Sequence, residues 1–342
     1  MEKKISVIIP CYNVEKYINR CVASLVRQTI GVENLELIFV DDASTDGTLE
    51  QLYQWEAKYP ESVMVVVCEE NGRQGRARNI GLDYASADYI SYVDADDWIE
   101  PEMLQMLYQA AMEQDVPVTA CRMGRDLGDG KIVKSYDLCH NKDELIYITS
   151  LQERHDFLKL SIGPVVAKLY LKSFLLDNHL FFPEQTAYED NYVIGLLAFC
   201  LPSIYVIDQE YYHYFANSAS TVTSKNAMHH FERLYIEIAL VEELKCRGLF
   251  GEFREEILGG FLCRYYINTL HMVFTRFETL PYEVLNEMRR EVLLRFPDYK
   301  ETKVYQELPE MSKGFCLTLE TEMTQEKWDN LAKNYIFLLK NK

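Results

Sequence analysis

The segments ISVIIPCYN (residues 5–13) and LELIFVDDASTDGT (residues 35–48) decide the fold. Each begins with a run of β-branched and other apolar residues, which is typical of a strand covered on both faces of a parallel sheet. Apolar residues then recur at helical spacing over residues 14–27 and 48–59. This alternation of strand and helix predicts a right-handed, Rossmann-like α/β sandwich with a mostly parallel sheet.

The pattern of apolar residues continues along the chain and predicts two domains. Residues 116–123 and 131–136 are expected to pair as antiparallel strands about a turn, and Pro101 introduces a helix. An α/β domain is therefore predicted over residues 1–220, and a helical domain over residues 221–342. Strands are predicted at residues 5–9, 35–40, 63–67, 89–93, 116–123, 131–136, 165–171 and 204–214, and helices at 14–27, 48–59, 74–84, 103–113, 231–246, 253–277, 282–296 and 327–339.

Composition excludes several classes of protein. The 342 residues include 35 Lys+Arg and 53 Asp+Glu, a net charge of −18, so binding to nucleic-acid phosphates is not expected. The nine cysteines contain no CxxC pair, which disfavours a disulfide framework or a zinc site and favours reduced thiols. The first apolar run is too short for a signal peptide, and no run approaches the ~18 residues of a spanning helix. A cytoplasmic location is expected, with any membrane contact peripheral.

Acidic residues follow two of the predicted strands. In an open α/β sheet ligands bind outside the carboxyl ends of the strands, where Asp42, Asp94 and Asp96 would lie. Asp94 and Asp96 are expected to project to one side of an extended segment. Clustered carboxylates of this kind fit Mg²⁺ or Mn²⁺ shared with a phosphate, and Arg76 and Arg78 supply positive charge beside a helix N-terminus. Neither GxxxxGK[ST] nor GxGxxG spacing is present, which disfavours P-loop enzymes and dehydrogenases.

Four ordered motifs carry a resemblance to a known family. They are VIIPCYN at 7–13, VDDASTDGT at 40–48, GRARNIG at 75–81 and VDADD at 93–97. Together they closely resemble the family 2 glycosyltransferases of GT-A fold. The match is strong over residues 4–110, weaker to about 222, and does not cover the helical C-terminus.

The resemblance implies a nucleotide-sugar site at the strand ends. Tyr12 would stack on the base, Asp42 would hydrogen-bond it, and Arg78 would lie near the nucleotide. Asp94 would contact the ribose or donor sugar, and Asp96, the second acid of the DxD motif, would hold the metal ion. The donor-binding residues implied in this way are Pro10, Tyr12, Asn13, Asp42, Gly75, Arg78, Asp94 and Ala95.

Weaker similarities continue downstream. The segment VAKLY at 166–170 resembles a Trp-Asn-Lys-Leu-Tyr segment of the family, with Val and Ala in its first two places. Glu189 and Asp190 resemble the family's Glu-Asp motif, which makes them the catalytic candidates, with Asp190 as the base. His213 stands where the family commonly has Arg, and His213 and Ser218 are candidate diphosphate contacts. Because neutral histidine lacks a fixed charge, a purely structural imidazole is the alternative for His213.

The implied activity is inverting transfer of a hexose or N-acetylhexosamine from a nucleoside diphosphate sugar, favoured as a UDP-sugar. The acceptor would be a hydroxyl of a glycan or lipid-linked molecule in surface polysaccharide synthesis, with Mn²⁺ or Mg²⁺ as cofactor. Two alternatives stay open, a nucleotidyltransferase and a non-catalytic nucleotide-sugar-binding subunit. The amphipathic segment at 327–339 either packs on its own domain or on a second copy in a homodimer, or lies on a membrane surface.

Overall fold

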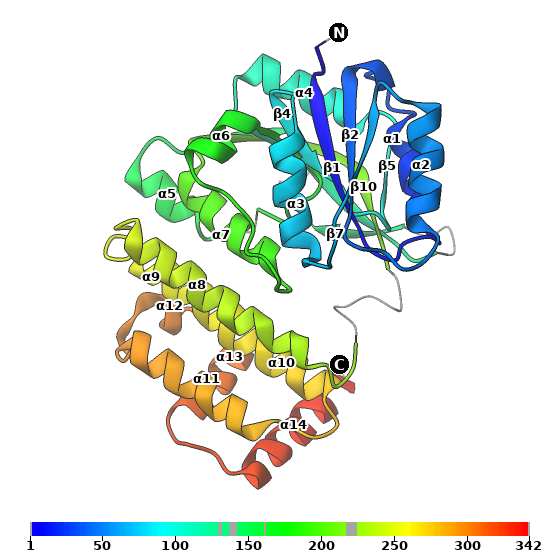
Figure 1. The fold of residues 1–342 in the computed structure, drawn as a ribbon. Helices are drawn as coiled ribbons and strands as arrows, with labels where there is room; N and C mark the ends of the chain where they lie inside the picture. Colours follow the sequence, from blue (N-terminus) through cyan, green and yellow to red (C-terminus); the bar gives the residue numbers. More distant parts are fainter. Residues whose placement is uncertain (1, 129–131, 137–141, 161, 217–223, 341–342) are drawn as a thin grey trace. The chain divides into compact units, whose positions relative to one another are not determined.

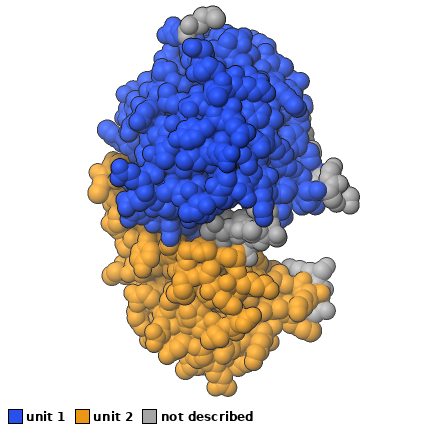
Figure 2. Space-filling view, turned by 45° about the vertical axis from the view of Figure 1, so that its right-hand side comes forward, with its two compact units in different colours: residues 1–217 blue, residues 218–342 orange. Residues whose placement is uncertain are grey.

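The structure, a computed structural model, describes residues 2–128, 132–136, 142–160, 162–216 and 224–340 (Figure 1). The chain forms two compact units, Met1–Asn217 and Ser218–Lys342, coloured separately in Figure 2. The boundary expected between residues 220 and 221 lies outside the described residues. Each unit is described by itself.

The first unit is built on one mixed sheet. Its strand order is β3-β2-β1-β4-β9-β6-β10-β5, with β7 paired to β6 and β8 paired to β10. The four strands from β3 to β4 are parallel to one another, which confirms the Rossmann-like α/β fold. The strands are β1 Ile5–Cys11, β2 Leu35–Asp41, β3 Val63–Val67, β4 Tyr89–Tyr92, β5 Trp98–Ile99, β6 Val118–Asp126, β7 Ile132–Tyr136, β8 Glu144–Tyr147, β9 Lys168–Leu171 and β10 Ser203–Phe215.

Helices cover both faces of this sheet (Figure 1). All seven residues of β1 are buried, as expected of a strand covered on both sides. A Cβ added to Gly81 would lie 2.3 Å from Cγ2 of Ile8, so glycine lets α3 approach β1 closely. The helices are α1 Ile18–Leu25, α2 Thr48–Lys58, α3 Arg73–Tyr84, α4 Met103–Gln114, α5 Leu151–Phe157, α6 Lys172–Asp177 and α7 Glu189–Cys200.

Several predicted bounds differ from the structure. The helix expected from residue 14 begins at Ile18, and the amide of Val14 before it donates to Oγ1 of Thr48. The turn expected from Gly124 begins later, since β6 continues to Asp126 and pairs antiparallel with β7 as predicted. The strands β5 and β8 and the helices α5 and α6 were not predicted.

The second unit is helical, as expected. The helix predicted over 253–277 is interrupted by a π-helical turn at Phe261–Ile267, which separates α9 from α10. Trp328 on α14 is fully buried and donates to Oδ1 of Asn286, so the start of the segment predicted at 327–339 packs on its own unit, whereas Phe337, Leu338 and Leu339 at its end are exposed. The helices are α8 Glu232–Cys246, α9 Arg254–Gly260, α10 Asn268–Arg276, α11 Tyr282–Arg295, α12 Lys303–Gln306, α13 Glu310–Cys316 and α14 Gln325–Lys340. No helix in the described part of the chain has the length and apolar character needed to cross a membrane.

Candidate active site

The loops after β1 and β2 are held together by side-chain hydrogen bonds. Oδ1 of Asn13 accepts from the amide of Thr45 at 2.8 Å, and the amide of Asn13 donates to Oγ of Ser44 at 3.0 Å. The Asn13 side chain therefore ties the two loops together. Tyr12 lies between the end of β1 at Cys11 and Asn13, and 49% of its surface is exposed. Pro10 lies inside β1, opposite Val40.

Asp42, at the end of β2, is almost completely buried. Its Oδ1 accepts from the amide of Gly72 at 2.8 Å, whereas its buried Oδ2 finds no hydrogen-bond partner among the described residues. Burial raises the pKa of Asp42, although the backbone amides of Gly72 and Arg73 oppose the shift. A buried acceptor without a hydrogen-bond partner is uncommon in folded proteins.

Residues 94–97, called the acidic turn below, form a tight turn after β4. The amide of Asp97 donates to the carbonyl of Asp94 at 3.0 Å, and β4 has already ended at Tyr92. The expectation of an extended segment at Asp94 and Asp96 is therefore wrong, whereas the projection of both side chains to one side stays a prediction. The chain reverses direction here because it must leave β4 and enter the short strand β5. Ala95 lies in the middle of this turn and is buried.

Asp96 is an acid whose charge the surroundings disfavour. Burial, and next the negative charge of Asp94, raise the pKa of Asp96 to about 6. The described residues contain no group of three or more His, Cys, Asp or Glu that would hold a metal ion by themselves. Mg²⁺ and Mn²⁺ in phosphate-binding sites are commonly held by one or two carboxylates plus phosphate oxygens. Two neighbouring carboxylates, one of which resists ionisation, fit that arrangement.

Arg78, on α3, joins this turn to the start of α7. Its side chain is 3% exposed, Nη2 lies 2.8 Å from Oδ1 of Asp94, and Nη1 lies 2.5 Å from Oε1 of Glu189. The guanidinium also lies over the ring of Phe182. Charge-assisted bonds of this kind are the strong ones, and a planar fork suits two acceptors. The contacts show Arg78 as an internal link, and its direct contact with the nucleotide stays a prediction.

Glu189 and Asp190 form the first turn of α7, and their environments differ. Glu189 is buried against Arg78, whereas Asp190 is partly exposed. Burial is the main cause that raises the pKa of each carboxyl, and Arg78 opposes the shift in both. Tyr188, just before them, has a left-handed backbone at φ 66°, a strained conformation of the kind that gathers at functional sites. Of the two side chains, Asp190 is the more accessible to solvent, and its catalytic role stays a prediction.

Gly75 sets the distance between α3 and the segment before α7. A Cβ added there would lie 2.2 Å from the carbonyl oxygen of Pro183 and 3.2 Å from Cγ of Glu189. Only glycine permits this approach. Packing alone therefore requires a glycine at position 75, and donor binding by Gly75 stays a prediction.

The predicted diphosphate contacts find no support in the described geometry. His213 is 2% exposed, its Nε2 lies 2.8 Å from Oε1 of Glu100, and its ring stacks on Trp98. These contacts favour the structural alternative for this imidazole. Ser218 lies outside the described residues. Lys168, in the segment 166–170, is also internal, because it is fully buried and donates to the carbonyl of Pro164, and burial lowers its pKa to about 7.

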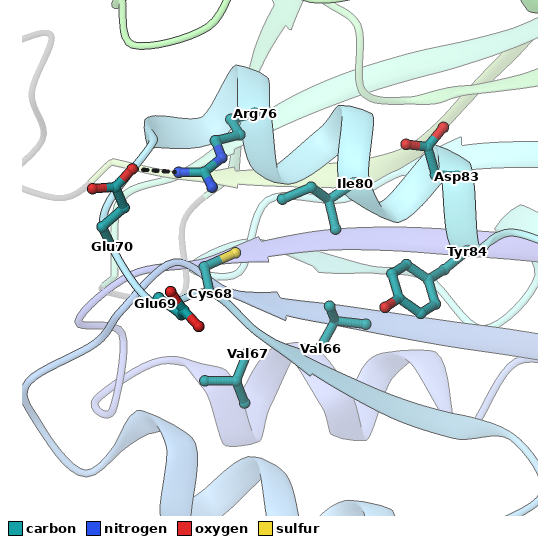
Figure 3. Close-up of a pocket in the computed structure, with 9 residues that line it drawn as sticks. All are labelled: Val66, Val67, Cys68, Glu69, Glu70, Arg76, Ile80, Asp83 and Tyr84. Carbon is teal, nitrogen blue, oxygen red and sulfur yellow. Dashed lines mark hydrogen bonds and ion pairs between the residues drawn. The ribbon is translucent and has the colours of Figure 1, made fainter.

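A cavity of about 590 Å³ lies beside α3, and neither Asp94 nor Asp96 lines it (Figure 3). It opens between the end of β3 and α3, and Arg76 reaches across it toward Oε1 of Glu70, 3.5 Å away. Arg76, expected to supply charge to a diphosphate, is therefore engaged on this side. The lining residues are Val66, Val67, Cys68, Glu69, Glu70, Arg76, Ile80, Asp83 and Tyr84.

Two residues that brace the acidic turn were missed. The sequence placed Asp97 only within the VDADD motif and Tyr212 only within the strand predicted over residues 204–214. Both are completely buried and hydrogen-bonded to each other at 2.6 Å. The repeated acids at 94, 96 and 97 were the sequence signal that could have pointed to Asp97. Asp97 differs from the other two acids because it is fully buried, and burial is not visible in the sequence.

Comparison with known proteins identifies the family. The family model for Glycosyl transferase family 2 matches residues 6–177. A poly(ribitol-phosphate) beta-glucosyltransferase of Bacillus spizizenii is 31% identical over 212 residues, which are 62% of this chain and 32% of that protein. TarS of Staphylococcus aureus, a poly(ribitol-phosphate) beta-N-acetylglucosaminyltransferase, is 27% identical over 265 residues, 77% of this chain and 44% of that protein. The chain thus spans less than half the length of both relatives.

Solved structures show the same fold. The crystal structure of S. aureus TarS 1-349 in complex with UDP-GlcNAc has a TM-score of 0.60 at 23% identity, covering 87% of this chain and 90% of that one. A mannosyltransferase from Pyrobaculum calidifontis, in complex with GDP-Man and Mn²⁺, has a TM-score of 0.50 at 14% identity and covers 98% of this chain and 86% of its own. With the family model matching half of its residues, the chain belongs to glycosyl transferase family 2.

Proposed function

We propose that the protein transfers a sugar from a UDP-sugar to a hydroxyl acceptor, with inversion at the anomeric carbon. The observation that carries the proposal is the Arg78 fork, which links Asp94 of the acidic turn to Glu189 of α7. This link brings the group suited to the departing diphosphate close to Asp190, the group suited to the attacking hydroxyl. A site for inverting transfer needs both groups in one place.

Donor binding would use the ends of β1 and β2. The exposed ring of Tyr12 offers a stacking surface for the base, and the unpartnered Oδ2 of Asp42 offers an acceptor for a base N–H. Stacking of a base on an aromatic side chain is worth about 1–3 kcal/mol. The relatives named above support a UDP-linked donor, since TarS was crystallised with UDP-GlcNAc.

Asp94 and Asp96 would hold a divalent cation together with the donor diphosphate. A cation bound there supplies positive charge that stabilises the departing diphosphate. The raised pKa of Asp96 supports the assignment, because the site without a cation disfavours that carboxylate charge. Mn²⁺ is the first cation to test, since it accompanies GDP-Man in the P. calidifontis structure.

Asp190 would act as the general base. The acceptor oxygen attacks the anomeric carbon from the face opposite the diphosphate, its proton passes to a carboxylate oxygen of Asp190, and the C–O bond to the diphosphate breaks with its electron pair on UDP. A raised pKa improves a carboxylate as a proton acceptor near neutral pH. Glu189 would position this residue by anchoring the first turn of α7 to Arg78.

The acceptor and the cellular setting follow from the relatives. Both curated relatives are named for transfer of glucose or N-acetylglucosamine to poly(ribitol-phosphate). A hexose or N-acetylhexosamine donor and a hydroxyl on a surface polymer or its lipid-linked precursor are therefore proposed here. The cysteines of the described residues are free, which supports a reducing compartment such as the cytoplasm.

The test is release of UDP by the purified chain with Mn²⁺. UDP-glucose and UDP-GlcNAc would each be supplied with and without a synthetic ribitol-phosphate oligomer. Acceptor-dependent UDP release is expected, and Asp190→Asn should lower kcat by about 10²- to 10⁴-fold while donor affinity is kept. Asp88→Asn, an exposed acid just before β4 and so at the opposite end of that strand from Asp94, is the matched control and should behave as wild type. Pyrophosphate release from UTP, or normal turnover by Asp190→Asn, would overturn the proposal.

A further inference from the structure

One buried hydroxyl contacts both ends of the acidic turn. Tyr212 of β10 is fully buried, and its Oη donates to Oδ2 of Asp97 at 2.6 Å. The same oxygen accepts from the amide of Asp94 at 3.1 Å. Because the amide of Asp97 also donates to the carbonyl of Asp94, the turn closes on itself around this hydroxyl.

Asp97 differs in role from the two acids before it. Its Oδ1 accepts from the amide of Phe215 at 2.8 Å, and its Oδ2 accepts from Tyr212, so both oxygens are occupied inside the protein. The residue is completely buried. Asp97 is therefore directed toward β10, which leaves Asp96 and the Asp94 oxygen that does not contact Arg78 for a cation.

The strand that carries Tyr212 is shaped for this contact. The pairing of β10 with β6 shifts register between Glu210 and Tyr212, and bulges of this type re-aim a side chain. Immediately beyond, Tyr212 pairs with Ile99 of β5, the strand that follows the turn. The Tyr212 hydroxyl and the pairing of Tyr212 with Ile99 therefore both hold the acidic turn against β10.

Arg20 of α1 holds the other flank of the turn. Its Nη2 donates to the carbonyl of Asp96 at 2.8 Å, and its Nη1 lies 2.9 Å from Oδ2 of Asp126. Trp98 also donates to that Asp126 oxygen, at 3.0 Å. The backbone at Asp94 and Asp96 is therefore fixed from two sides, while the carboxylates themselves project from the fixed segment.

We propose that Tyr212 is a positioning residue for cation and diphosphate binding, because its hydroxyl holds the turn that presents Asp94 and Asp96. The inference rests on the proposed function. Groups that orient metal ligands from behind typically change metal affinity by about 10- to 100-fold when removed. Tyr212→Phe removes both hydrogen bonds of the hydroxyl and leaves the ring in place.

The test is Mn²⁺ binding, followed through the electron paramagnetic resonance signal of free Mn²⁺ in the presence of UDP. We expect Tyr212→Phe to weaken Mn²⁺ binding roughly 10- to 100-fold and to leave metal-free UDP binding unchanged. The matched control is Tyr170→Phe, which also removes a buried hydroxyl, one that donates to the carbonyl of Val165. Equal Mn²⁺ affinity in wild type and Tyr212→Phe would overturn the proposal and leave the proposed function intact. Failure of wild type to bind Mn²⁺ with UDP would instead refute the proposed function.

A second variant distinguishes a residue that supports the acidic turn from a residue that binds the metal ion. Asp97→Asn keeps the shape of the side chain and one acceptor oxygen, so we expect a smaller loss of Mn²⁺ affinity than in Asp96→Asn. It also keeps the test open if Tyr212→Phe does not fold. A loss equal to that of Asp96→Asn would make Asp97 a ligand and overturn the inference.

Discussion

Replacing Asp96 by asparagine is expected to stabilise the cation-free protein and to abolish its response to Mn²⁺. Burial and the charge of Asp94 raise the pKa of Asp96 from 3.8 to about 6. At pH 7.5 the carboxyl is ionised in both the folded and the unfolded chain. The shift of about two pKa units then corresponds to an upper bound of about 3 kcal/mol of lost folding free energy. Asparagine has a similar shape and carries no charge, so it removes this penalty.

The pH dependence has a defined sign. A raised folded-state pKa means that the folded protein binds the proton more tightly than the unfolded chain. The stability contributed by Asp96 is therefore complete below about pH 3.8 and is lost as the pH rises through about 6. The advantage of Asp96→Asn should fall to roughly half between pH 7.5 and pH 5.

The assay is thermal unfolding at these two pH values, first without cation and then with Mn²⁺ and UDP. At roughly 2–4 °C per kcal/mol, the variant should melt up to about 6–12 °C higher than wild type at pH 7.5 without cation. Mn²⁺ added to UDP should stabilise wild type beyond the effect of UDP alone and should give the variant no such increment. A variant that melts below wild type at pH 7.5, or an advantage that does not shrink at pH 5, would refute the reasoning.

Three further substitutions test separate parts of the site. Arg78→Lys replaces a fork by a single ammonium and leaves one buried carboxylate unpaired, so urea unfolding should show a loss of about 3–5 kcal/mol; a loss under about 1 kcal/mol would contradict the internal link. Gly75→Ala places a methyl group 2.2 Å from the carbonyl oxygen of Pro183 and should cost about 1–3 kcal/mol in the same measurement, whereas wild-type stability would show that the two segments can separate freely. Tyr12→Ala should leave stability within about 0.5 kcal/mol and weaken UDP binding by about 5- to 150-fold in calorimetry, and unchanged UDP affinity would remove the stacking role.

The central sheet was predictable because its strands have a simple signal. The runs at 5–9 and 35–40 are continuous and apolar, and β1 and β2 are buried along nearly their whole length. The strand β5 has only two residues, Trp98 and Ile99, which is too short for any periodicity. Its existence depends on pairing with β10, a contact that residue order does not reveal.

The site was predictable in its location and less so in its internal roles. Asp42, Asp94 and Asp96 follow the ends of β2 and β4 as predicted, and the carboxyl ends of parallel strands meet at one edge of a sheet. Arg78 and Glu189 are 111 positions apart in the sequence. The contact between them therefore depends on how α7 packs against α3. The family resemblance placed Arg78 near the nucleotide, but the burial of Arg78 and its two ion pairs could not be predicted, because a buried and an exposed arginine look the same in a sequence.

The most direct test of the account is anomalous diffraction from crystals of the full chain grown with Mn²⁺ and UDP. The account predicts one manganese peak bound by the carboxylates of Asp94 and Asp96 and by diphosphate oxygens, with the uracil ring on Tyr12. A peak elsewhere, or UDP bound with Asp96 directed away from its diphosphate, would contradict it.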